Sequence, residues 1–389
     1  MKKRGFMAAL AIGAGIMTFT GSQAVAANKA QCPKMKNCPM QATVSKLECA
    51  NSSYFMVADT KMLKPQLNSM LQKFVAQFPA QQAMQAHMVI GLVSQVCDLA
   101  GISDINSIGQ SSTVLVPAAP GRDVIFHNRL VAMADPAGKT PLIFQLTKGE
   151  EIKLADFAAS VPGDAVSAAT VSLDFSTVLK AIKEQKIFPI PPQALDSIKQ
   201  ELGLSAEELA ASLTGRISVI VMNFDPAGKN VQIVLSVTDR GNKVYSLIAR
   251  SMGVDPAANN KLAVPDPTMP LEVVKGKDAM TIYIGKGTAA ALQQKIAAGQ
   301  TVAKDPAFAL YSGKIPAVAH GYGLGMLEFN KKGLANVTAY KYEQNVFVYY
   351  NNCNYDWNGM PFAFMLNLVS PFANNPDAAK LFKALPDML

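Results

Sequence analysis

Short apolar runs that follow one another with only a turn between them constrain the fold of this chain more than any other feature. Two such successions occur, at residues 113–116, 124–133 and 142–146 and at residues 317–329, 337–342 and 346–350. Runs of this length predict β-strands, and strands joined by short turns favour antiparallel pairing. Because stretches with helical periodicity lie between the two successions, we expect an α+β fold with antiparallel sheets and helices on one face.

The same order of elements is expected twice along the chain. A strand-like run at residues 53–58 precedes two helical patterns at residues 67–78 and 80–100, each with an apolar stripe on one face. A second strand-like run, at residues 165–173, also precedes helical patterns and then strands. This repeated strand–helix–helix–strands order indicates an internal duplication, and coincidence within an α+β chain is the alternative.

Local signals within this pattern set the expected boundaries. Ser205 and Glu208 have the spacing of a capping box and predict the start of a short helix. The expected divisions are a signal peptide at residues 1–26, a flexible leader at 27–42, a first α+β half at 43–160, a second α+β half at 161–255 and a C-terminal α+β region at 256–389.

The first 26 residues have the three parts of a secretory signal. Lys2, Lys3 and Arg4 supply the positive charges, residues 6–19 form the apolar segment, and residues 24–26 form a small-x-small cleavage site. An uncleaved anchor is the alternative. After the signal no run of about 18 apolar residues occurs, so we expect no transmembrane segment. The sequence therefore predicts an exported protein, either periplasmic or secreted.

Composition excludes several classes of protein. Half of the 389 residues are hydrophobic and 16% are charged, which excludes a disordered chain, and five cysteines are too few for a disulfide mini-scaffold. The net charge is +8, and removing the three signal charges leaves 8 − 3 = +5. This bias is far from the dense basic surface that nucleic-acid binding needs. We expect no nucleic-acid partner and no cofactor.

Two of the cysteines lie close together in the leader. Cys32 and Cys38 are expected to form a small disulfide loop, which an exported protein can keep. The alternative is a soft-metal site, because thiolates favour Cu(I). The odd count leaves at least one of the remaining residues, Cys49, Cys97 and Cys353, paired elsewhere or unpaired.

The histidines give two contrasting expectations. His127 lies on a strand face of mixed polarity and is expected at the surface. His320 alternates with Tyr322 on one face of a strand whose other face carries Gly321, Gly323 and Gly325. Glycine weakens a strand unless something approaches closely. A ligand or partner backbone could fill that space, and a tightly packed helix is the alternative.

Aromatic residues gather near the end of the chain, and they complete the expected binding set. Five of the ten tyrosines and the single tryptophan fall within residues 340–357. Rigid rings supply contact area for sugars or peptides, although aromatics also pack well in antiparallel strands. The binding residues predicted from the sequence are His320, Tyr322, Tyr340, Tyr342, Tyr349, Tyr350 and Trp357.

Several short motifs resemble a known class of proteins. A strand that ends in Asp59 or Asp174, each before an amphipathic helix, occurs in both halves. The stretches at residues 203–217, 282–285 and 305–308 add strand–helix junctions. Over most of residues 50–330 the chain resembles bacterial exported proteins of unknown function that are built from repeated strand–helix halves. The resemblance implies an α+β fold and a location in the cell envelope, and it implies no activity and no functional residues.

No catalytic motif stands out in the sequence. G-x-S-x-G, H-E-x-x-H and an S-x-x-K motif with its companion boxes are absent. We therefore expect a non-enzymatic protein that binds an envelope protein or polymer. The alternative is a secreted hydrolase whose histidine and acidic residues meet only in the folded chain. The sequence predicts neither the partner nor the oligomeric state.

Overall fold

A computed structural model describes most of the chain, and it divides the chain into two compact units. Unit 1 comprises residues 1–143 and 343–370, and unit 2 comprises residues 144–342 and 371–389. The described residues are 39–48, 52–60, 84, 91, 98, 101, 104–135, 138, 140–185, 199–200, 203–224, 231–264, 266, 269–328, 331–343 and 345–356. The expected signal peptide, the Cys32–Cys38 loop, Trp357 and nearly all of the first two helical patterns lie outside the described residues.

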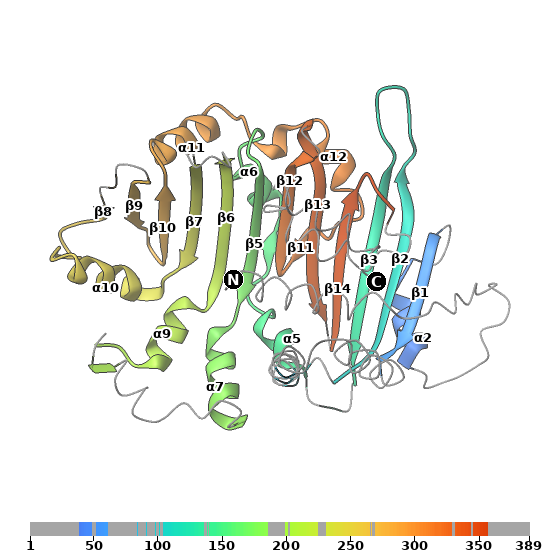
Figure 1. Ribbon diagram of the computed structural model, residues 1–389, viewed down its shortest axis with the longest axis horizontal. Coiled ribbons are helices and arrows are strands. Elements are labelled where there is room, and N and C mark those ends of the chain that lie inside the picture. The colour runs from blue at the N-terminus through green and yellow to red at the C-terminus, as the bar shows by residue number, and fades with distance from the viewer. Residues whose placement is uncertain are drawn as a thin grey trace. The chain divides into compact units, whose positions relative to one another are not determined.

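Unit 1 is built on antiparallel strands in the order β1-β2-β3-β14 (Figure 1). Their bounds are Ser52–Asp59, Ile105–Val116, Ile125–Ala134 and Val346–Cys353. Helix α2, Pro39–Lys46, contacts β1, β2 and β3. Just after this helix, Leu47 packs against an apolar core of Val131, Met133, Val346 and Val348. This core occupies one end of one sheet face.

Three elements near unit 1 differ from the sequence-based expectations. Helix α2 begins at Pro39, inside the expected leader, because proline at the first helical position needs no N–H partner. Strand β2 begins at Ile105 rather than at residue 113, so a mostly polar stretch is strand. Residues 142–146 form helix α5, not a strand, because a short apolar run does not distinguish the two.

Unit 2 contains a larger antiparallel sheet in the order β13-β12-β5-β6-β7-β10-β9-β8 (Figure 1). In chain order the bounds are β5 Ser167–Leu173, β6 Gly215–Phe224, β7 Val231–Thr238, β8 Lys261–Val264, β9 Leu271–Lys275, β10 Ala279–Ile284, β12 Gly321–Glu328 and β13 Lys331–Glu343. A small second sheet pairs β4, Ile152–Lys153, with β11, Val318–Ala319.

The helices of unit 2 follow or connect these strands. They are α6 Leu154–Ala159, α7 Phe175–Gln185, α9 Ala206–Leu213, α10 Lys243–Ser251, α11 Thr288–Ala297 and α12 Phe308–Tyr311, with 3-10 turns η2 Arg240–Asn242 and η3 Val302–Lys304. The expected capping box of α9 is confirmed. The Ser205 hydroxyl accepts from the Glu208 N–H at 3.1 Å, and the Ser205 N–H donates to Glu208 Oε2 at 2.9 Å.

The expectation that helices lie on one sheet face is not met in unit 2. Phe157 of α6 stacks on Tyr322 at a centroid distance of 6.4 Å. Directly paired residues on neighbouring strands point to the same face of a sheet. Tyr322 pairs with Thr170, and the pairing continues across β6 and β7 to Thr281, so these three side chains share one face. Met280, the neighbour of Thr281, therefore points to the opposite face, where it packs with Tyr245 of α10. Helices α6 and α10 lie against opposite faces of this sheet.

Candidate functional site

The predicted binding residues near His320 are buried parts of unit 2. His320 is 6% exposed, and its Nδ1 accepts the backbone N–H of Tyr342 at 3.2 Å. Tyr322 is 3% exposed, stacks on Phe157 and donates its hydroxyl to the carbonyl of Pro316 at 2.8 Å. Burial raises the pKa of the Tyr322 phenol well above its usual range. These side chains stabilise the bend between β11 and β12.

The neighbouring strand fills the space above the three glycines of β12. A Cβ on Gly321 would come within 2.8 Å of the Tyr340 ring, and the side chains of Thr338 and Asn336 lie over Gly323 and Gly325 in the same way. The expected occupants of this space are a ligand or partner backbone or, as the alternative, a tightly packed helix. The close approach comes from side chains of β13, which pairs with β12.

The remaining predicted aromatics divide between the two units. In unit 2, Tyr342 lies 5.5 Å from the ring of Phe144, and Lys148 Nζ lies 5.7 Å from the Tyr342 ring centre. In unit 1, Tyr349 is buried, whereas Tyr350 is half-buried and faces Arg129. The predicted set is therefore not one cluster within either unit. Of its unit 1 members, Tyr350 belongs to the polar network described next.

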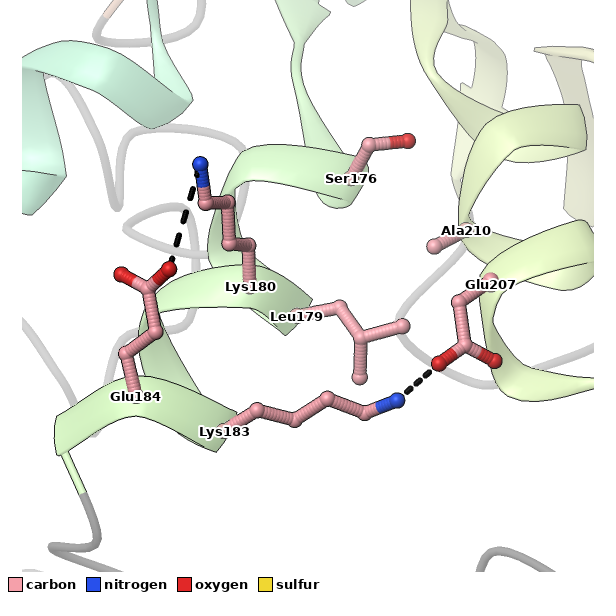
Figure 2. A pocket seen from close by; sticks show the side chains of 7 residues that line it. All are labelled: Ser176, Leu179, Lys180, Lys183, Glu184, Glu207 and Ala210. Atoms are coloured by element: carbon pink, nitrogen blue, oxygen red, sulfur yellow. Dashed lines mark hydrogen bonds and ion pairs between the residues drawn. The ribbon is translucent and has the colours of Figure 1, made fainter.

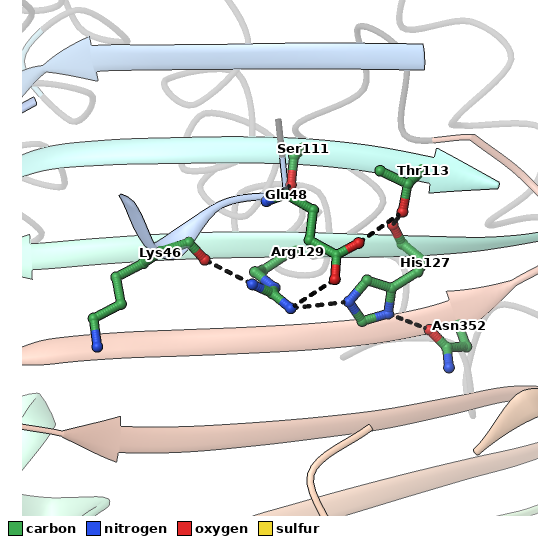
Figure 3. Close-up of polar contacts among 7 residues, drawn as sticks. All are labelled: Lys46, Glu48, Ser111, Thr113, His127, Arg129 and Asn352. Atoms are coloured by element: carbon green, nitrogen blue, oxygen red, sulfur yellow. Dashed lines mark hydrogen bonds and ion pairs between the residues drawn. The ribbon is translucent and has the colours of Figure 1, made fainter. Parts of the chain in front are cut away.

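His127 is buried, so its expected surface position is wrong. It is 1% exposed because the segment after α2 crosses its face of the sheet (Figure 3). Arg129, two residues further along β3, donates to the carbonyl of Lys46 at 2.8 Å and pairs with Glu48 at 3.3 Å. These contacts join positions more than 80 residues apart in sequence, which single-strand periodicity does not reveal.

The hydrogen bonds of His127 assign its tautomer. Nδ1 lies 2.6 Å from Asn352 Oδ1, which only accepts, and Nε2 lies 3.5 Å from Arg129 Nη2, which only donates (Figure 3). The network therefore assigns a neutral ring with the proton on Nδ1. With both ring nitrogens engaged in this way, His127 is not aimed at a nucleophile.

Glu48 and Arg129 form the partly exposed rim of this network. Their side chains are 27% and 18% exposed, respectively. The Glu48 carboxylate also accepts from the Thr113 hydroxyl at 3.2 Å, and the Glu48 N–H donates to Ser111 Oγ at 3.3 Å. The Arg129 guanidinium lies 5.1 Å from the centre of the Tyr350 ring, a cation–π distance. Four contacts thus fix the orientation of Arg129.

The opposite face of the same strands is also polar and buried. The Ser112 hydroxyl donates to Asn128 Oδ1 at 2.7 Å, and Asn128 Nδ2 donates to the Tyr355 carbonyl at 3.2 Å. Asn351 is fully buried, and both polar atoms of its amide have no hydrogen-bond partner among the described residues. We call residues 110–113, 127–129 and 350–353 the polar end of the unit 1 sheet. Buried polar groups are costly, so their concentration here marks a candidate functional site.

A shallow groove in unit 2 is a weaker candidate. It lies between α7 and α9, has a volume of about 400 Å³ and is lined by Ser176, Leu179, Lys180, Lys183, Glu184, Glu207 and Ala210 (Figure 2). Lys183 is ion-paired with Glu207, and Lys180 lies 3.9 Å from Glu184. Because the four charges are already paired, the groove offers a half-buried leucine and one serine hydroxyl to a ligand.

Sequence reasoning missed Glu48, Arg129 and Asn352. A signal for them exists in the polar residues of strand β2, which alternate to both faces between residues 106 and 113, and in the asparagines at 351, 352 and 354. These stretches lack the apolar alternation by which a half-buried strand is identified. In the described part of the chain no group of three His, Cys, Asp or Glu side chains could hold a metal ion.

Comparison of the chain with family models, with curated proteins and with solved structures finds no match. Among the described helices, none is long and apolar enough to span a membrane.

Proposed function

We propose that this chain is an exported envelope protein that binds a protein or polymer partner without catalysing a reaction. The observation that carries the proposal is the pair of Arg129 and Tyr350 at the rim of the polar end. Arginine and tyrosine are enriched in the few residues that dominate binding energy at interfaces. Here both are half-buried, and Glu48, Lys46 and His127 orient the arginine before any partner arrives.

Because Arg129 is already held in one orientation, binding a partner costs it less conformational entropy. A free arginine side chain loses rotamer freedom when it is immobilised at an interface, at a cost of about 0.5–1.5 kcal/mol. Arg129 has already lost that freedom through its contacts with the Lys46 carbonyl, the Glu48 carboxylate and the Tyr350 ring. Because the Glu48 charge offsets the Arg129 charge, we expect partner selection by shape and hydrogen bonding more than by net charge.

The same geometry favours binding over the hydrolase alternative. The Thr113 hydroxyl donates to this network's carboxylate, but Thr113 is 3% exposed and cannot meet a substrate without rearrangement. The carboxylate that it contacts is already paired with Arg129 at 3.3 Å. His127 is engaged by Asn352 and Arg129 rather than by a nucleophile.

The export and the envelope location in this proposal are inferred from the sequence. The positive, apolar and small-residue segments of residues 1–26 support export. The resemblance to bacterial exported proteins supports an envelope location.

We also propose that the chain arose by internal duplication. Strands β1-β2-β3 of unit 1 and β5-β6-β7 of unit 2 are antiparallel and have the same order. In both units a long stretch of chain, residues 60–104 or 174–214, separates the first strand from the following hairpin. The matching order and spacing support descent from one ancestral unit.

Site-specific photocrosslinking tests the proposed binding site. A photoreactive phenylalanine analogue replaces Tyr350 in intact cells of the organism that produces the protein. The control places the same analogue at Val114, which is 48% exposed on the opposite face of the sheet. We expect a discrete adduct from position 350 and none from position 114. Absence of an adduct from position 350, or equal adducts from both positions, would contradict the proposal.

A further inference from the structure

We propose that one face of the unit 2 sheet binds a sugar acid, a polyhydroxy ring that carries one carboxylate, at Arg216 and a row of hydroxyls beside it. We call Thr170, Ser218, Ser236 and Thr281 the hydroxyl row. The inference does not depend on the proposed function of unit 1. It rests on hydrogen-bond donors that share one sheet face and exceed the acceptors available to them among the described residues.

Strand pairing places the hydroxyl row in one line across β5, β6, β7 and β10 (Figure 1). Ser218 pairs directly with Thr170 on one side and with Ser236 on the other. Ser236 in turn pairs with Thr281. Directly paired side chains point to the same face, so the four hydroxyls share it. Because neighbouring strands lie about 4.8 Å apart, the row spans about 14 Å, which exceeds the width of one sugar ring.

Arg216 is held in a fixed orientation at one end of the hydroxyl row. Its Nε–H donates to Thr170 Oγ1 at 3.0 Å and to Ser218 Oγ at 3.2 Å. The side chain is half-buried, and its terminal nitrogens have no hydrogen-bond or ion-pair partner in the part of the chain that the structure describes. These nitrogens form a planar fork that matches a carboxylate with two parallel hydrogen bonds.

The hydroxyl row has further hydrogens to donate. Thr170 Oγ1 and Ser218 Oγ lie 2.8 Å apart, and Thr170 is fully buried. We therefore assign Thr170 as the donor of this bond, which leaves the hydrogen of the half-buried Ser218 for a ligand. Ser236 and Thr281 lie 3.4 Å apart and use one of their two hydrogens in the same way. An excess of donors favours a ligand with several oxygen acceptors.

A buried hydroxyl next to Arg216 also lacks a partner. Ser172 pairs directly with Arg216, and its Oγ is buried without a hydrogen bond among the described residues. Gly149 lies against this hydroxyl, since a Cβ at position 149 would clash with it. Nearly all buried polar atoms in folded proteins are paired. An unpaired hydroxyl here indicates a missing partner at the Arg216 end of the row.

The charges of the neighbouring segment leave Arg216 as the excess charge. Segment 148–156, which reaches the sheet at Gly149, carries two lysines and three carboxylates, Lys148, Lys153, Glu150, Glu151 and Asp156. Glu150 pairs with Arg240 at 2.6 Å, so the segment and Arg240 together are neutral. One positive charge remains at Arg216. A single carboxylate fits this balance better than a phosphate with two negative charges.

Three small molecules test the class of ligand. The purified protein is titrated calorimetrically with galacturonate, galactose and acetate at constant ionic strength. Galactose has the ring hydroxyls without the carboxylate, and acetate has the carboxylate without the ring. We expect saturable binding of galacturonate and at least tenfold weaker binding of both controls. Equal binding of galactose would overturn the role of Arg216, equal binding of acetate would overturn the sugar, and no saturable binding would overturn the site.

Variants locate the binding on this face of unit 2. Arg216→Gln should weaken galacturonate binding at least tenfold. Arg250→Gln, an exposed arginine on α10 at the opposite face, should leave it unchanged. If Arg216→Gln lowers the unfolding midpoint, Ser236→Ala carries the test, because the 3.4 Å contact of Ser236 with Thr281 is the longest in the row. Ser236→Ala should weaken galacturonate binding at least threefold and leave acetate binding unchanged. Unchanged galacturonate affinity in Ser236→Ala would show that the hydroxyl row serves only the fold.

Discussion

Replacing Asn352 by alanine removes the acceptor for one ring nitrogen of a buried histidine. His127 is 1% exposed, and its Nδ1 lies 2.6 Å from Asn352 Oδ1. Water does not reach this nitrogen readily, so the variant leaves a buried donor unpaired at a cost of about 1–3 kcal/mol. We expect Asn352→Ala to lower the free energy of unfolding by about 2 kcal/mol. At about 2–4 °C per kcal/mol, Tm should fall by about 4–8 °C.

The adjacent residue supplies a matched control. Asn351 is on the same strand and is equally buried, but its amide has no partner among the described residues. Asn351→Ala removes the same atoms without breaking a hydrogen bond, so its unfolding free energy should stay within about 1 kcal/mol of the parent. Urea unfolding with unchanged m values measures both variants. Equal destabilisation by the two substitutions would refute the role assigned to the His127–Asn352 hydrogen bond.

Three further outcomes follow from contacts in unit 2. Burial raises the pKa of Tyr340, so its contribution to stability is complete below the unfolded value near pH 10 and is lost as the pH rises towards the folded value. The absorbance of Tyr340 as tyrosinate, taken as the difference between the parent and Tyr340→Phe, should therefore appear only with unfolding. Ser205→Ala should cost about 1 kcal/mol in urea unfolding by removing the cap that accepts from Glu208; no loss would exclude the capping role. Gly321→Ala should cost about 1–3 kcal/mol, because its Cβ would approach the Thr170 carbonyl oxygen to 2.9 Å. Gly163→Ala, whose nearest atom would lie 3.7 Å away, should be tolerated, and equal costs would contradict this account.

Local signals predicted the elements that depend on neighbouring residues. The capping box at Ser205 is confirmed by both of its hydrogen bonds, and it starts α9 where the sequence predicts a short helix. These features depend on contacts within about one helical turn, so a single sequence carries them. The antiparallel α+β character also followed from the close succession of strands.

The candidate site depends on contacts between distant parts of the chain. The position of His127 follows from Glu48, which meets Arg129 across 81 residues of sequence. The glycines of β12 are covered by side chains of β13 at positions that register alone determines. Alternation within one strand predicts which face of the sheet a side chain points to. It does not predict which other segment of the chain covers that face. The polar half of β2 carried too little apolar alternation to indicate a strand.

The affinity of the partner captured at position 350 tests the central claim most directly. The measurement compares the parent protein with Arg129→Gln and with Arg122→Gln, an exposed arginine of the same unit. Circular dichroism confirms that all three are folded. We predict that Arg129→Gln binds at least tenfold more weakly, about 1.4 kcal/mol, while Arg122→Gln binds as the parent does. Equal affinities for the parent and Arg129→Gln would contradict a binding site at the Arg129–Tyr350 pair.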